Sequence, residues 1–213
     1  MAADDARRAR ILSAAERLFS QYGVRRTSME LLAAEAGVAK PTLYAYFGSK
    51  EQLFRAVVQE LILAVLDEAA AVASARLPVQ ATVQGILEAK FTRMHELVFS
   101  SPHAAELLAS SDAQARDIAA EGDRQFRGIL ADVLRAAQTD GQLELVGLTT
   151  DDLADALMVG GHGASWNAAS VAEHRRNIAM QVRLLLAGVT PPVGPASASS
   201  AGSGPVLEPP AAT

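Results

Sequence analysis

Residues 27–53 read TSMELLAAEAGVAKPTLYAYFGSKEQL, and this stretch decides the fold. Thr27 and Glu30 have the spacing of a capping box, in which each side chain satisfies a free amide at a helix start. Gly37 suits a sharp bend, because a residue without Cβ adopts positive φ at a helix end. Pro41 suits the first turn of a second short helix, where its missing N–H costs nothing. The stretch therefore predicts a helix-turn-helix, whose second helix can lie in a DNA major groove.

The second predicted helix has one polar face and one apolar face. Leu43 and Phe47 are four residues apart and form the stripe that we expect to be buried. The exposed face offers one cation and three hydroxyls that can donate hydrogen bonds to phosphates or base edges: Lys40, Thr42, Tyr44 and Tyr46. The alternative is a plain three-helix packing unit whose polar residues are only solvated. The complete run of signals favours the DNA-binding interpretation.

A third helix is predicted directly after the second. Ser49 and Gln52 have the spacing of another capping box. Lys50 follows at the start of this helix, where a cation is unfavourable against the positive end of the helix dipole. The exception is a helix start that meets an anion, and helix N-termini are ready anion sites. The sequence therefore predicts that Lys50 contacts a phosphate group.

Residues 23–54, GVRRTSMELLAAEAGVAKPTLYAYFGSKEQLF, closely resemble the DNA-binding domain of the TetR (tetracycline-repressor-like) family, and the resemblance is strong over residues 8–58. It implies a dimeric one-component regulator whose C-terminal domain binds a small effector. It also implies phosphate contacts for the positions of Thr27, Tyr44, Tyr46 and Lys50, whereas Lys40, Pro41 and Thr42 match positions that face the groove. Ser28 is a further DNA-binding candidate.

Ala39 departs from the family pattern, because many members have Ser or Thr as the cap of the recognition helix. An alanine at this position forfeits roughly 1 kcal/mol of capping, which Pro41 partly offsets. This departure affects the expected details of the cap and not the expected domain.

Composition favours packed helices in a cytoplasmic protein. The chain has 213 residues, half of them hydrophobic, but only 5% aromatic residues, which favours helices over sheets. It has no Cys, so disulfides and Cys-based metal or nucleophile sites are excluded. The first residues include acids and no apolar stretch, unlike a secretory signal. The uncharged run 156–172 contains glycines and polar residues and is a poor membrane span, so no membrane partner is expected.

Charge is divided unevenly along the chain. Residues 1–55 carry nine Lys and Arg against six Asp and Glu, whereas the remainder carries ten against eighteen. A basic segment joined to an acidic one is typical of nucleic-acid binding, since the acidic part is repelled from DNA and orients the basic part toward it. One of Arg7, Arg8 and Arg10 is a candidate phosphate contact, the alternative being a solvated helix start.

Helical patterns continue from residue 56 to 189, so the predicted fold class is all-α. We predict a helix-turn-helix domain over 1–55 and a helical effector-binding and dimerisation domain over 56–189. The tail 190–213 is rich in Pro, Ala, Gly and Ser and is predicted to be disordered. The predicted helices of the second domain span 53–75, 80–99, 103–109, 113–138, a segment capped by Thr150 or Asp151 and ending near 167, and a segment capped by Ser170 with Glu173 and ending at 188.

The last two predicted helices are expected to pair with a second copy of the chain. The first has a face of small and aliphatic residues, and the second has a larger aliphatic stripe; these are Leu153, Ala156, Leu157, Gly160, Gly161 and Ala164, and Ile178, Val182, Leu185 and Leu186. Two helices from each of two chains would bury these faces as a four-helix bundle. The alternative is that they only close the core of each monomer.

An effector pocket is expected among the middle helices. A mostly apolar lining with a few polar groups suits a hydrophobic ligand, and the candidate lining residues are Phe91, Met94, His95, Phe99, Phe126, Leu130, His162 and Trp166. The alternative is that such stripes are ordinary helix core, and that His95 and His162 are core or rim histidines.

Catalytic motifs do not stand out in the sequence. The four histidines lack zinc-binding spacing, and no phosphate-binding loop, dinucleotide fingerprint or nucleophile elbow is present. We therefore predict no enzymatic activity, no cofactor and no metal. The predicted function is a transcriptional regulator, a repressor released from a palindromic double-stranded DNA operator by a small, mainly apolar effector. The alternative is an architectural, chromosome-organising DNA-binding protein that ignores small molecules.

Overall fold

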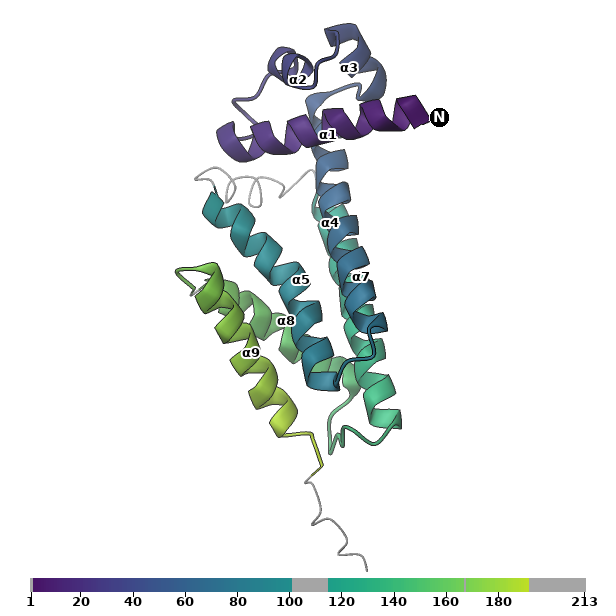
Figure 1. Ribbon diagram of the computed structural model, residues 1–213, viewed down its shortest axis with the longest axis vertical. Helices are drawn as coiled ribbons and strands as arrows, with labels where there is room; N and C mark the ends of the chain where they lie inside the picture. Colours follow the sequence, from purple (N-terminus) through teal and green to yellow (C-terminus); the bar gives the residue numbers. More distant parts are fainter. Residues whose placement is uncertain (1, 101–114, 167, 192–213) are drawn as a thin grey trace, which may run out of the picture.

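The computed structural model describes residues 2–100, 115–166 and 168–191, without the side chains at 2, 97–100 and 166. Within these ranges every regular element is an α-helix, which confirms the predicted fold class (Figure 1). The helices are α1 (Ala2–Tyr22), α2 (Met29–Glu35), α3 (Lys40–Tyr46), α4 (Lys50–Ser74), α5 (Val79–Ser100), α7 (Arg116–Thr139), α8 (Thr150–Trp166) and α9 (Val171–Ala187). The predicted helix 103–109 and the tail from residue 192 lie outside the described residues.

The first three helices and the start of α4 enclose one hydrophobic core at one end of the molecule (Figure 1). The rings of Phe19 on α1 and Phe54 on α4 meet edge to face, with 5.9 Å between their centroids. Leu43 of α3 and Leu32 of α2 are also buried there. This core holds the two short helices in place, because helices of seven residues are too short to be stable alone.

Helix α4 belongs to both parts of the molecule. Its first turns place Leu53, Phe54 and Val57 in the N-terminal core, and its later turns place Leu66 and Ala69 in a second core. A helix of 25 residues is about 37 Å long at 1.5 Å per residue. The boundary predicted after residue 55 falls inside this helix. Helix α4 is therefore a rigid connection between the two cores.

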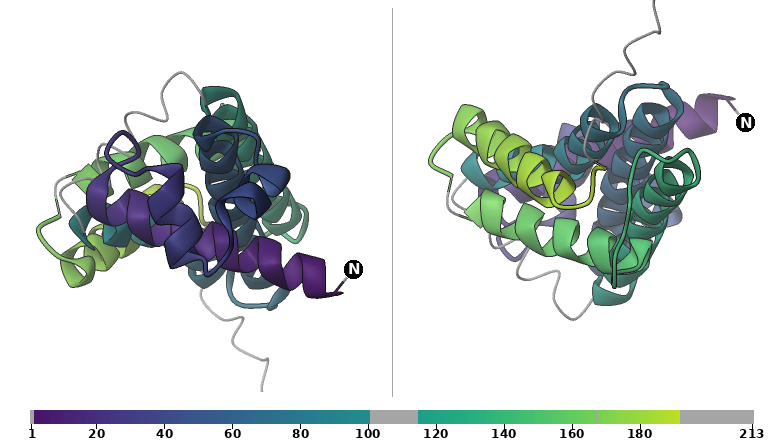
Figure 2. Two further views of the ribbon diagram at one scale, coloured as in Figure 1. Left: turned by 90° about the horizontal axis from the view of Figure 1, so that it is seen from above. Right: turned by 90° about the horizontal axis from the view of Figure 1, so that it is seen from below.

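The second core lies among α5, α7, α8, α9 and the far half of α4 (Figure 1). Helix α5 packs against all four of the others. The side chains that fill the centre are aromatic and aliphatic and include Ile86, Leu87, Phe91, Phe126, Leu130, Leu134, Leu157, Ile178 and Val182. Seen along the long axis, α8 and α9 lie side by side on one flank of this domain (Figure 2).

Two of the predicted capping boxes are confirmed. The Ser49 hydroxyl accepts a hydrogen bond from the Gln52 amide at the start of α4, and the Gln52 side chain accepts one from the Gly48 amide. At the start of α9, the Ser170 hydroxyl accepts from the Glu173 amide. These hydrogen bonds satisfy amides that have no partner within the helix.

Three predicted helix starts are wrong by a few residues. Helix α2 is capped by Ser28, whose hydroxyl accepts from the Leu31 amide, and not by Thr27, which is buried. Helix α8 is capped by Thr149, which exchanges hydrogen bonds with Asp152, in place of Thr150 or Asp151. Helix α7 begins at Arg116 and not at 113. Adjacent hydroxyl residues cap equally well in isolation, so packing decides between them.

The dimer faces predicted on α8 and α9 are mostly interior to the monomer. Leu153, Leu157 and Gly161 of α8 are buried against α5 and α9, as are the α9 residues Ile178, Val182 and Leu186. These positions lie on the sides of the two helices that face the domain, so they close the core of one chain. The large apolar side chains on the outer sides are different ones: Val159, Met180 and Leu184, which are 73%, 51% and 65% exposed.

None of the helices in the part of the chain that the structure describes combines the length and apolar character needed to cross a membrane.

Candidate nucleic-acid interface

The turn between α2 and α3 sets the angle at which α3 leaves the core. Gly37 has a φ of 63°, in the left-handed region that favours glycine. Its amide donates to the carbonyl of Ala34 at 3.1 Å, and the Val38 amide donates to that of Ala33 at 3.0 Å. The turn therefore closes the end of α2 with its own backbone and starts α3 at once, as the sequence predicts.

Helix α3 turns its apolar stripe inward and its polar face outward. Leu43 and Phe47 are buried in the N-terminal core, which confirms the predicted stripe. Ala39 is the N-cap and makes no side-chain capping bond, while Pro41 occupies the first turn. Four of the remaining candidate side chains are exposed or half-buried on the outer face: Lys40, Pro41, Thr42 and Tyr44. Tyr46 is half-buried and packs against the N-terminal core. This face lies at the far end of the molecule from the second core (Figure 1).

The two candidates that precede α2 have different environments. Thr27 is 1% exposed, and its hydroxyl donates to the carbonyl of Gly23 at 2.8 Å. Ser28 is exposed, and its hydroxyl oxygen accepts from the Leu31 amide at 3.1 Å. The hydroxyl hydrogen of Ser28 can still donate to an approaching oxygen. The structure therefore brings the Ser28 hydroxyl, and not that of Thr27, to the surface.

Lys50 has a local role that the sequence did not reveal. It is the first residue of α4, and its ammonium group donates to the backbone carbonyls of Thr27 at 3.1 Å and Arg25 at 3.4 Å. These carbonyls belong to the segment between α1 and α2. The cation at this helix start therefore fixes that segment beside the interface.

Two donors of the α3 face contact carboxylates of neighbouring helices. The Lys40 ammonium forms an ion pair with Glu30 of α2, which raises the pKa of Lys40 and lowers that of Glu30 through their hydrogen bond. The Tyr46 hydroxyl donates to the carboxylate of Asp4 on α1, and this hydrogen bond raises the pKa of Tyr46. Lys40 also lies 5.9 Å from the centre of the Tyr44 ring. Glu30 and Asp4 lie 10 and 42 residues before their partners, on other helices, so spacing within one helix did not indicate these contacts.

The predicted effector-binding residues gather around the second core. Phe91, Phe126 and Leu130 are buried within it. His162 is exposed, but its ring meets Phe91 edge to face, with 4.9 Å between the ring centroids. Met94 is half-buried. The side chains of Phe99 and Trp166 lie outside the part that the structure describes. Burial of this extent is also what ordinary helix packing produces, so the ligand-binding role of these residues stays a prediction.

His95 forms a stacked pair with a histidine that was not a candidate. Its ring lies parallel to that of His174 on α9, with 4.9 Å between centroids and 9° between ring planes. Both rings are buried, at 3% and 0% exposed. Burial lowers the pKa of His174, and the nearby His95 lowers it further, although the backbone of Ala164 acts in the opposite direction. The stacked pair therefore joins α5 and α9 within the second domain.

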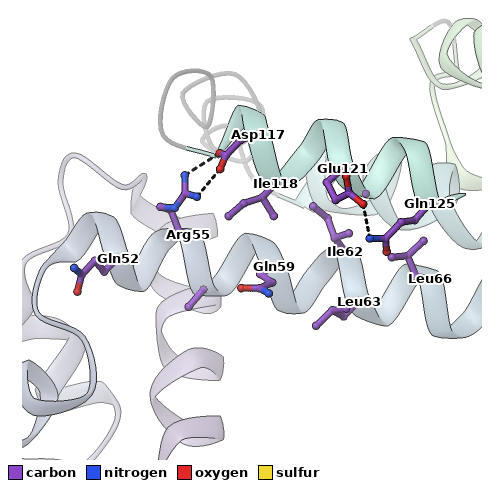
Figure 3. Close-up of a pocket in the computed structure, with 12 residues that line it drawn as sticks. Gln52, Arg55, Gln59, Ile62, Leu63, Leu66, Asp117, Ile118, Glu121 and Gln125 are labelled. Carbon is purple, nitrogen blue, oxygen red and sulfur yellow. Dashed lines mark hydrogen bonds and ion pairs between the residues drawn. The ribbon is translucent and has the colours of Figure 1, made fainter.

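A groove of about 520 Å³ lies between α4 and α7, close to the N-terminal core (Figure 3). Arg55 of α4 binds Asp117 of α7 at its upper end with two hydrogen bonds of 2.9 and 2.7 Å, which lower the pKa of Asp117 to about 2. The groove is lined by apolar side chains such as Ile62 and Ile118 and by polar ones such as Gln59 (Figure 3). Within the described ranges, no group of three or more His, Cys, Asp or Glu side chains is placed to hold a metal ion.

Comparison with known proteins agrees with this geometry. Residues 11–57 match the family described as bacterial regulatory proteins, tetR family. The HTH-type transcriptional repressor SCO4008 of Streptomyces coelicolor is 32% identical over 149 residues, which cover 64% of this chain and 74% of that protein. The chain belongs to the TetR family. It is therefore a DNA-binding transcriptional regulator, and α2 and α3 are the helix-turn-helix of a TetR domain.

Other TetR-family proteins show where the similarity lies. The regulator RutR of Escherichia coli K12 is 46% identical over 57 residues, 27% of each chain. SmeT, the repressor of the Stenotrophomonas maltophilia multidrug efflux pump SmeDEF, superimposes in its triclosan complex with a TM-score of 0.69 at 23% identity, covering 95% of this chain and 100% of that one. A TetR regulator from Haloarcula marismortui gives 0.71 at 15% identity, covering 88% and 100%. The fold is thus shared along the chain.

Proposed function

We propose that this TetR-family protein is a cytoplasmic homodimeric repressor, which binds an inverted-repeat operator through α3 and leaves it when a small, mainly apolar effector binds. The observation that carries the proposal is the outer face of α3, where Lys40, Thr42 and Tyr44 remain accessible on a helix anchored by Leu43 and Phe47. The Tyr46 ring packs against the core, and its hydroxyl lies at the end of the same helix. Repression is supported by SCO4008, a transcriptional repressor, and by SmeT, the repressor of an efflux pump.

Dimerisation is supported by the outer surface of α8 and α9. Val159, Met180 and Leu184 are exposed there, and the small residues Ala156 and Gly160 lie on the same side of α8. Exposed apolar side chains gathered on two adjacent helices are typical of a surface that another protein covers. A second copy of the chain is the natural occupant, since two recognition helices are needed to read an inverted repeat.

Release by an effector is supported by the shared helix α4. A ligand bound within the second domain would act on the far half of α4, whose first turns hold the N-terminal core. A change in the angle of α4 would alter the separation of the two recognition helices in a dimer. SmeT has been crystallised with triclosan, which makes apolar compounds the first class to test.

Selection of bound duplexes from a random pool is the direct test of operator recognition. We expect recovery of an inverted repeat whose half-sites lie one helical turn or a multiple apart, about 34 Å centre to centre. Recovery of duplexes with no shared sequence would favour the architectural alternative.

Lys50→Ala should weaken binding to all duplexes and reduce the salt dependence of binding. If the ammonium contacts a phosphate, its removal lowers the slope of log affinity against log salt by about 0.9 per protomer. The same variant also removes the hydrogen bonds to the carbonyls of Thr27 and Arg25, so its thermal unfolding should be measured alongside.

Thr42→Ala should instead change base preference at one position of the half-site.

Arg135→Ala is the matched control for Lys50, because it removes one positive charge from an exposed site on α7. It should leave the salt slope unchanged. If a folded Lys50→Ala protein kept the wild-type DNA affinity and salt slope, Lys50 would not contact a phosphate.

A panel of apolar compounds that includes triclosan should contain at least one that lowers operator affinity. Couplings of about 1–3 kcal/mol correspond to roughly 5- to 150-fold changes in affinity. Phe91→Ala and Phe126→Ala are poor reporters of the site, because these side chains are buried in the core and each truncation costs about 3–5 kcal/mol of stability. Met94→Ala and Leu63→Ala compare the core region with the groove between α4 and α7. Operator affinity that no compound changes would favour an effector-independent protein.

A further inference from the structure

Two acidic residues bind hydrogen-bond donors of α3, the helix that is proposed to contact DNA. Glu30 pairs with the ammonium of Lys40, and Asp4 accepts the hydrogen bond of the Tyr46 hydroxyl. The acids come from two different helices, α2 and α1, and they contact opposite ends of α3. The arrangement therefore restrains both the first and the last residue of the recognition helix.

Fold stability does not account for these contacts. The side chains of Lys40 and Glu30 are 49% and 61% exposed, and exposed ion pairs contribute only about 0–1 kcal/mol. The core beneath α3 is already filled by Leu43 and Phe47. Their position is more informative, because carboxylates on a surface that receives phosphates repel the ligand and compete with it for the same donors.

We propose that Glu30 and Asp4 are specificity-determining residues that hold Lys40 and Tyr46 in the free protein and so weaken binding to DNA of arbitrary sequence. The inference rests on the proposed function of α3. A phosphate that takes the ammonium from Glu30 replaces one charge-assisted hydrogen bond with another and leaves a carboxylate beside the DNA backbone. Nonspecific contact therefore gains little from Lys40 or Tyr46. The base edges of an operator offer fixed acceptors at the same face, which nonspecific duplexes do not offer in register.

Glu30→Gln should raise the affinity for a 30-base-pair duplex of random sequence. The Lys40 ammonium, no longer paired with a carboxylate, adds one phosphate contact. This contact steepens the slope of log affinity against log salt by about 0.9 per protomer. If variant and wild type bind equally at 1 M salt, the variant binds roughly tenfold more tightly near 50 mM salt. Asp4→Asn should raise the affinity by a smaller factor, because the Tyr46 hydroxyl carries no charge and the Asn carbonyl can still accept a weaker hydrogen bond from it. Affinities are measured by fluorescence anisotropy from about 50 to 300 mM salt, with thermal unfolding as the check of folding.

Matched controls remove the same charge without freeing a donor of α3. Glu35 lies on α2 as Glu30 does, but it pairs with Arg17 of α1 at 3.0 Å. Asp5 is the neighbour of Asp4 in the first turn of α1. Glu35→Gln and Asp5→Asn should therefore change the affinity much less than their counterparts. Equal gains from the control variants would mean that net charge alone acts, and would overturn the proposal.

A double-mutant cycle isolates the pairing itself. In a Lys40→Met background, Glu30→Gln should lose most of its gain in affinity and should no longer steepen the salt slope. In a Tyr46→Phe background, Asp4→Asn should likewise lose most of its gain, because only the repulsion between the carboxylate and the phosphates remains. A gain that persists at full size in either background would also overturn the proposal, because the acid would then act without its donor. A wild-type protein that binds no duplex near 50 mM salt would instead remove the proposed function, and with it this inference.

Discussion

Leu184→Glu is expected to give a folded monomer whose operator affinity is lower by at least roughly a hundredfold, since joining two binding modules commonly raises affinity by about 10²–10⁴. Leu184 is 65% exposed on the outer side of α9. A carboxylate there is harmless in a monomer, but its burial in an interface without a partner would be costly. Sedimentation should show half the wild-type mass, and thermal unfolding should show that the monomer remains folded.

Leu148→Glu is the control for this experiment. Leu148 is also exposed, at 51%, but it lies in the loop before α8 and outside the proposed interface. The control should keep both the dimer and the operator affinity. A wild-type protein that sediments as a monomer at micromolar concentration would rule out dimerisation through this surface, whatever the variant does.

Gly161→Leu is expected to destabilise the second domain by about 3 kcal/mol or more, because overpacking a filled core costs about 1–3 kcal/mol and occasionally more. A Cβ at this position would lie 2.2 Å from a ring carbon of Phe91. Phe91 is 1% exposed and sits within the core, so the ring has no space to move into. Urea unfolding followed by circular dichroism measures the loss.

Gly128→Leu makes the same substitution at another glycine, and it is expected to stabilise the protein. Gly128 is exposed on α7, and a Cβ there would meet no atom within 4 Å. Replacing a glycine inside a helix with a good helix former stabilises the helix by about 0.5–1 kcal/mol. If Gly161→Leu unfolded at the wild-type urea concentration, the close contact of α8 with Phe91 would not exist in solution.

The helix-turn-helix could be predicted from the sequence because its signals are local. Gly37 at the turn, Pro41 in the first turn of α3 and Ser49 before α4 each act on neighbouring backbone. The errors in this region are also local. Thr27 and Ser28 are both good caps, and only the burial of Thr27 under α1 selects Ser28.

The sequence does not predict in the same way which helix, or which chain, packs against a given helix face. Helical spacing indicates that Leu157 and Ile178 are buried, but it does not say whether the neighbour belongs to the same chain or to a second one. The structure assigns both residues to the core of the monomer. Likewise, Arg55 and Asp117 are 62 positions apart, and pairing of Tyr46 with Asp4 depends on how α1 crosses α3. Such contacts follow from the tertiary arrangement alone.

The buried histidine pair gives the two halves of the protein different tolerance to acid. Because burial lowers the pKa of His174 below its ordinary 6.5, an unfolded chain takes up a proton that the folded domain refuses. Stability from this residue is fully present above about pH 6.5 and is lost as the pH falls through the lower folded pKa. All four histidines lie beyond residue 90, so mild acid would loosen the seam between α5 and α9 and leave the DNA-reading helices untouched. Mild acid is therefore expected to destabilise the second domain before it affects the DNA-binding domain.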